Sequence, residues 1–122
     1  MIALTACHHD GHERQRAVGH PVMRADPWLH PILVIRSADW VPAVHDAARN
    51  VLDDVLRRAD TAALLAIVPA ALAVAGRRRG DHALHAATEA LRHAPGDVAQ
   101  AVRRSAGPST RRLAYRIGVE TG

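Results

Sequence analysis

The residues best suited to bind a metal ion are gathered near the start of the chain, as Cys7, His8, His9 and His12. Thiolate and imidazole groups are ligands that zinc prefers, and a continuous helix would put His8 and His12 on one face. However, Asp10-Gly11 predicts a turn that interrupts such a helix. A structural zinc site also needs a second group of ligands, which the sequence does not supply. We therefore expect no metal, and we interpret these histidines as part of a polar turn.

A second group with possible chemistry is Asp81, His82 and His85, at the start of an expected helix. A carboxylate beside a histidine could transfer protons. No nucleophile or glycine-rich phosphate loop accompanies the group, and the common motifs of nucleotide-binding proteins, zinc proteases and hydrolases are missing. We therefore interpret Asp81 as a helix cap and expect a non-enzymatic protein without a cofactor.

Arginine is the third distinctive feature, because all 16 basic residues are Arg and Lys is absent. The abundance of Ala and Arg is typical of a GC-rich bacterial genome, so the high isoelectric point overstates the case for an anionic partner. Residues 1–60 hold seven Arg and eight acidic residues, whereas residues 61–122 hold nine Arg and four acidic residues. A basic C-terminal half favours an acidic protein or nucleic acid as partner.

The candidate binding residues are eight of the nine arginines of this half. They are Arg77, Arg78, Arg79, Arg103, Arg104, Arg111, Arg112 and Arg116. They would form one basic stripe if their turns lie on one edge of the molecule. No aromatic residues are interleaved with them, so stacking on single-stranded bases is not expected, whereas contacts to the DNA or RNA backbone are. The alternative is a solvated helix face with pairs between helices.

The elements that must position these side chains are helices. Apolar residues recur at i, i+3, i+4 and i+7 after Pro42, which suits a first helical turn. The segment 62–75 is apolar nearly all round, so we expect it to be the most buried helix, kinked at Pro69. Gly76 is its expected stop, and residues 24–31 are expected to be a loop or a short turn. The predicted helices cover residues 12–23, 42–59, 61–75, 81–93 and 98–104, with a last one from about residue 110.

Length and composition predict one all-α domain spanning residues 1–122. Phe is absent, and only Trp28, Trp40 and Tyr115 are aromatic, so Ala, Leu, Val and Ile must build the core. The segment 62–75 is too short to cross a membrane. A single cysteine excludes an internal disulfide, and the start of the chain lacks the basic region of a signal peptide. We therefore expect a cytoplasmic protein without membrane contact.

A short pattern recurs along the chain. Residues 14–18, 44–48 and 111–115 each follow a polar turn and each begin an expected helix. When the copies are aligned on their alanines, Ala48 follows Ala17 by 31 residues and Ala114 follows Ala48 by 66 residues. These distances are close to one and two periods of about 33 residues. A repeat of this length is typical of stacked helical hairpins.

These residues resemble the HEAT and HEAT-like repeat family, whose first helix follows a polar turn with Asp and then carries Val-Arg and small residues. Residues 37–48 match best, with His45 where Arg is usual. Residues 108–114 and 9–17 keep the Arg but not the Val. Residues 81–91 are a doubtful fourth copy, 39 and 27 residues from their neighbours, without the Arg.

The resemblance implies a short right-handed α-solenoid of about five or six antiparallel helices. It also implies that Asp39 and Arg111 serve as structural bridges between successive turns. The function implied is a protein-interaction scaffold that binds another protein, with a nucleic-acid-binding domain as the alternative. A further implication is self-association through exposed ends, or membership of a longer repeat array.

Overall fold

The protein is all-helical in the computed structural model, which describes the backbone of residues 10–121 and the side chains of residues 10–118. Within these residues there are eight α-helices and one 3-10 helix, and no β-strand. They are α2 (Gly11–Val18), α3 (Pro21–Ala25), η1 (Pro27–Leu29), α4 (His30–Ser37), α5 (Pro42–Arg57), α6 (Thr61–Val74), α7 (Asp81–Arg92), α8 (Gly96–Ser105) and α9 (Pro108–Thr121).

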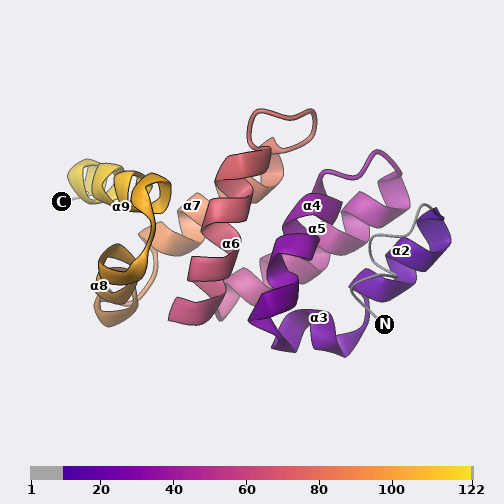
Figure 1. Cartoon of the computed structure of the whole chain (residues 1–122), viewed down its shortest axis with the longest axis horizontal. Coiled ribbons are helices and arrows are strands. Elements are labelled where there is room, and N and C mark those ends of the chain that lie inside the picture. Colours follow the sequence, from indigo (N-terminus) through magenta and orange to yellow (C-terminus); the bar gives the residue numbers. More distant parts are fainter. Residues whose placement is uncertain (1–9, 122) are drawn as a thin grey trace.

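The helices form two rows, and the chain advances along the longest axis of the molecule from α2 to α9 (Figure 1). In one row, α5 contacts α2 and α7, and α7 contacts α9. In the other row, α6 contacts α4 and α8. Neighbours in sequence also pack as pairs across the rows: α4 with α5, α6 with α7, and α8 with α9. The three pairs begin at His30, Thr61 and Gly96, which are 31 and 35 residues apart.

The alanines of the recurring pattern all lie in the first row, where the helices approach each other. Ala17, Ala48 and Ala114 are buried, and so is Ala87, the corresponding residue of the doubtful fourth copy. A methyl side chain at these positions allows neighbouring helices to pack closely. These four alanines thus share a buried position in helices of the first row.

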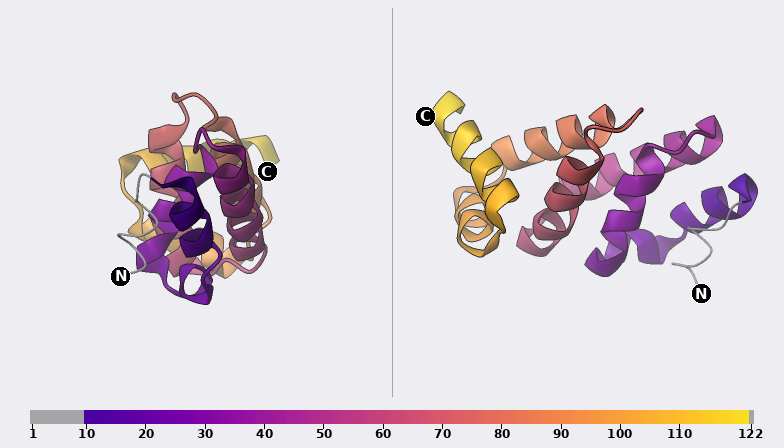
Figure 2. Two further views of the ribbon diagram at one scale, coloured as in Figure 1. Left: turned by 90° about the vertical axis from the view of Figure 1, so that its right-hand side faces the viewer. Right: turned by 45° about the horizontal axis from the view of Figure 1, so that its top comes forward.

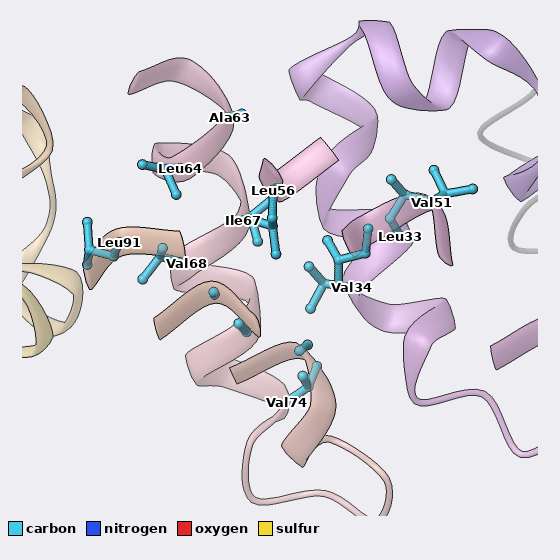
Figure 3. Packing of buried hydrophobic residues seen from close by; sticks show 14 of the residues in the cluster. Leu33, Val34, Val51, Leu56, Ala63, Leu64, Ile67, Val68, Val74 and Leu91 are labelled. Atoms are coloured by element: carbon cyan, nitrogen blue, oxygen red, sulfur yellow. The ribbon is translucent and has the colours of Figure 1, made fainter. Parts of the chain in front are cut away.

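The core lies between the two rows and runs as a single cluster from Ala17 to Ile117. Figure 3 shows Ile67 of α6 beside Leu56 of α5, and Val68 pointing toward Leu91 of α7. The apolar stripe predicted after Pro42 is confirmed, because the buried residues of α5 recur at helical spacing. These buried residues are Val44, Ala48, Val51, Leu52 and Leu56.

One predicted helix at the N-terminal end is not continuous in the structure. The helix expected over residues 12–23 is divided, because α2 ends at Val18 and α3 begins at Pro21. Between them, the ring of His20 accepts a hydrogen bond from the backbone amide of Val22 at 3.2 Å and so caps α3. Pro21 thus occupies a first-turn position, where its missing N–H costs nothing, rather than a poorly tolerated place near a helix end.

The expectation of a loop or a short turn over residues 24–31 is wrong in part, because Arg24 and Ala25 belong to α3 and α4 begins at His30, whereas η1 between them is a short 3-10 turn. Pro31 lies in the first turn of α4, where proline is compatible with a helix. Residues 32–36 gave no clear helical pattern because isoleucine and valine favour strands in isolation. Leu33 and Val34 are fully buried against the core, and this burial outweighs the local preference.

The turn between α6 and α7 depends on Gly80 and not on Gly76. A Cβ atom on Gly80 would lie 2.0 Å from the carbonyl oxygen of Val74, whereas one on Gly76 would meet nothing within 4 Å. Arg79 next to it adopts a left-handed backbone conformation with φ of 67°. The chain therefore reverses tightly over the end of α6 at Gly80.

We expect the Gly80→Ala variant to be destabilised, because the added methyl would force the backbone away from the Val74 carbonyl. The expected loss in the free energy of unfolding is about 1–3 kcal/mol. Urea unfolding followed by circular dichroism measures it. Gly76→Ala is the matched control and should leave the unfolding midpoint within error, so an equal effect of both variants would refute this account of the turn.

Candidate functional site

Helix α6 has two different apolar sides. Six of its residues are buried, including Leu64, Ile67 and Val68. On the opposite side, Ala62, Pro69 and Ala73 are exposed. The expectation that this is the most buried helix agrees with these six buried residues, and only its outer side is left uncovered. No charged residue lies between Thr61 and Val74, so the exposed side offers only apolar groups to solvent.

The apolar surface continues from α6 onto η1 and α4. Trp28 is 90% exposed, and with Pro31 it lines a hollow of about 330 Å³ against Leu65 and Ala66 of α6. Ile35, one helical turn further along α4, is also exposed. We call this surface the α4–α6 face. It consists of Trp28, Pro31, Ile35, Ala62, Leu65, Ala66, Pro69 and Ala73.

Trp40 marks the other end of the α4–α6 face. It is 72% exposed and lines a hollow of about 220 Å³ together with Ile35, Arg77 and Arg78. The turn before α5 and the turn after α6 thus lie side by side. Both tryptophans of the chain are exposed, one near each end of the same apolar surface. Tryptophan is enriched among residues that dominate the energy of protein interfaces.

The turn that carries Trp40 is held by the buried carboxylate of Asp39, whose side chain is 1% exposed. One oxygen accepts from Arg14 Nε and Arg36 Nη1, both at 2.9 Å. The other accepts from Arg14 Nη2 at 3.2 Å and from the amide of Val41 at 2.9 Å. The carboxylate therefore connects α2, the end of α4 and the start of α5. Asp39 accordingly forms the bridge that the resemblance implied.

Burial raises the pKa of Asp39, but the hydrogen bond from Arg14 and that from the Val41 amide lower it, as do the charges of Arg14 and Arg36. The balance leaves the pKa of Asp39 below its ordinary value of 3.8. Asp39 is thus a buried anion throughout the neutral range, matched by two guanidinium groups.

We expect Asp39→Asn to lower the free energy of unfolding by about 3–5 kcal/mol, because the buried Arg14 would lose its ion pair with this carboxylate. Chemical unfolding at pH 7 measures this loss. Glu13→Gln is the control, because the Glu13–Arg16 pair is largely exposed and worth about 0–1 kcal/mol. Equal effects of the two variants would show that the buried network does not hold the fold together.

The lowered pKa of Asp39 also predicts how this difference depends on pH. A carboxyl group with a lower pKa in the folded state stabilises fully above its unfolded pKa of about 3.9, and this stabilisation is lost as the pH falls toward the folded value. The gap in unfolding free energy between the wild type and Asp39→Asn should therefore be constant from pH 5 to 7 and shrink below about pH 4. A gap that grows on acidification would contradict the assignment.

No protein-family model matches this chain, and no curated protein or solved structure matches it either. The site must therefore be argued from its own geometry. Of the helices in the described part of the chain, none is long and apolar enough to cross a membrane.

The eight predicted arginines fall into two separate groups. Arg77, Arg78 and Arg79 lie in the turn between α6 and α7, which projects from the middle of the molecule (Figure 1). The other five lie on α8 and α9, which form one end of it (Figure 2). Arg103 and Arg104 are on α8, and Arg111, Arg112 and Arg116 are on α9. All are exposed except Arg103, which is half-buried.

Arg111 does not form the bridge that the resemblance implied. Its Nη2 atom donates to the carbonyl oxygen of Ala106 at 2.9 Å, so it stabilises the local turn before α9. By contrast, Arg49 links two neighbouring turns: Nε donates to the carbonyl of Ser37 at 3.0 Å and Nη2 to that of Arg79 at 3.4 Å. Sequence reasoning missed this role of Arg49.

The groups considered for acid–base and metal chemistry are dispersed. Asp81 is the first residue of α7, preceded by Gly80 as the cap, so it favours the helix through its charge and is not a side-chain cap. His82 pairs instead with Asp53 of α5 at 3.0 Å. Among the described residues no three potential ligands gather around a possible metal position. Cys7, His8 and His9 lie outside the described residues.

The α4–α6 face was not predicted from sequence, although two signals for it were present. A helix of 14 residues without a charged group predicts strong burial, and only one side of it meets the core. Residues 32–36, for which no helix is predicted, belong to the helix that provides Pro31 and Ile35 of this surface. The sequence pattern assigns no position to the two tryptophans, and both are exposed.

Proposed function

We propose that this protein is a non-enzymatic scaffold that binds another protein through the α4–α6 face. The observation that supports the proposal is an exposed apolar surface on two adjacent helices with an exposed tryptophan near each end. Contiguous apolar surface of this kind is uncommon on proteins that function alone, and it is typical of interaction sites. Binding a partner would remove Trp28 and Trp40 from water.

We also propose that the fold is a short α-solenoid of HEAT-like type. Three features support this proposal: the two rows of helices, the pairs that begin at intervals of 31 and 35 residues, and the buried alanine at the same place in each helix of the first row. The bridge from Asp39 to Arg14 joins two successive helices of that row. Such folds offer extended surfaces for partners, but the architecture alone does not define a function.

Nucleic-acid binding receives less support. A duplex would best be bound by a continuous row of cations that follows the phosphates. The arginine groups at the α6–α7 turn and on α8–α9 belong to different parts of the molecule (Figures 1 and 2).

The proposal predicts that charges placed on the α4–α6 face abolish binding without unfolding the protein. Ala62→Arg combined with Ala73→Arg changes two exposed positions, and Arg is nearly as good a helix former as Ala. We expect partner retention to fall about tenfold or more, because each new charge would have to be desolvated in the interface. Tagged protein, incubated with extract of its source organism, provides the measurement.

Ala43→Arg, at an exposed position of α5 away from this face, is the matched control. A specific partner should be retained in equal amounts by the wild type and by Ala43→Arg, and be lost from the double variant, while all three proteins unfold at similar temperatures. Equal retention by the double variant would place the binding site elsewhere.

A further inference from the structure

The two ends of the α4–α6 face differ in charge. At the Trp40 end, the hollow is lined by Arg36, Arg77 and Arg78, and by a single acidic residue, Asp39. Both oxygens of Asp39 are already occupied by hydrogen bonds. This end therefore has an excess of positive charge.

At the Trp28 end, the charges balance. The neighbouring hollow beside Pro27 is lined by Arg24 and Arg58 and by Asp54 and Asp60. Arg24 and Asp54 are paired at 2.9 Å. The face thus runs from an electrically neutral, proline-rich end to a cationic end.

The guanidinium groups of Arg77 and Arg78 lie at the Trp40 end of this surface. Both are exposed, and in the described part of the chain no hydrogen bond or ion pair involves either side chain. Arg24 and Arg36 have carboxylate partners. An arginine that has no partner among the described residues, and that lies beside an exposed tryptophan, is well placed to bind a carboxylate from outside.

We infer that the partner presents an apolar segment followed on one side by Asp or Glu residues, with the apolar part on the α4–α6 face and the carboxylates at Arg77 and Arg78. This inference rests on the proposed function and adds the chemistry and direction of the partner. Arg77 and Arg78 lie at only one end of an otherwise apolar surface, so they attract the acidic side of the segment to that end. In the reversed orientation the two arginines would have no carboxylate to pair with.

The test is selection of 16-residue peptides from a random display library on the full chain, followed by affinity measurement on synthetic copies. We expect selected peptides to carry apolar residues with Asp or Glu concentrated on one side. Arg77→Glu with Arg78→Glu should weaken their binding about tenfold or more, since two attractive contacts become repulsive. Arg103→Glu with Arg104→Glu changes the net charge equally and should leave the affinity unchanged.

A charge exchange makes the assignment specific. Peptides in which Asp and Glu are replaced by Lys should lose affinity for the wild type and regain it with the Arg77→Glu, Arg78→Glu variant. If the peptides bind this variant unchanged but are lost on Ala62→Arg with Ala73→Arg, the acidic partner is refuted while the binding face stands. If Ala62→Arg with Ala73→Arg has no effect, or if no peptide is selected, the face itself is refuted and the inference with it.

Discussion

The carboxylate of Asp39 is the contact on which the arrangement of the N-terminal half depends. Its two oxygens receive hydrogen bonds from α2, from the end of α4 and from the residue before α5. A buried ion pair of this kind adds little net stability compared with an apolar core, but it permits only one relative placement of the groups it joins. Here it fixes the turn of residues 38–41, and with it the position of Trp40. The first row of helices and the cationic end of the α4–α6 face are therefore held by the same interaction.

Helix α6 has the opposite character, because its position is determined by apolar contacts alone. Its buried side completes the core between the two rows, and Figure 3 shows Ile67 and Val68 directed toward different helices. The outer side carries the same residue types without any neighbour to cover them. Burial of one side is sufficient to order the helix, so the apolar character of the other side is not required by folding. This uncovered apolar surface is the physical reason for proposing that a partner binds to the outer side of α6.

Sequence predicted those parts of the fold that depend on local pattern. The stripe of α5 and the all-helical class follow from periodicity. Helix α4 is not predicted because its isoleucines and valine favour strands locally, and contacts with α5 and α6 help to stabilise it. The candidate site is not predicted for the same reason, since Pro31 and Ile35 of the α4–α6 face lie on α4. Which side of an apolar helix meets the core is decided by residues distant in sequence.

The arginines show why residue counts are a weak guide to function in a chain without lysine. A guanidinium group carries donors in several directions, so it can join backbone carbonyls and carboxylates that a lysine would reach singly. Arg49 joins the ends of two turns, Arg111 closes a third, and Arg14 serves the buried carboxylate. These structural uses explain much of the basic composition without any anionic partner. The arginines that can serve a partner are those without such a structural contact. Among them, Arg77 and Arg78 are exposed beside Trp40 at the edge of an apolar surface.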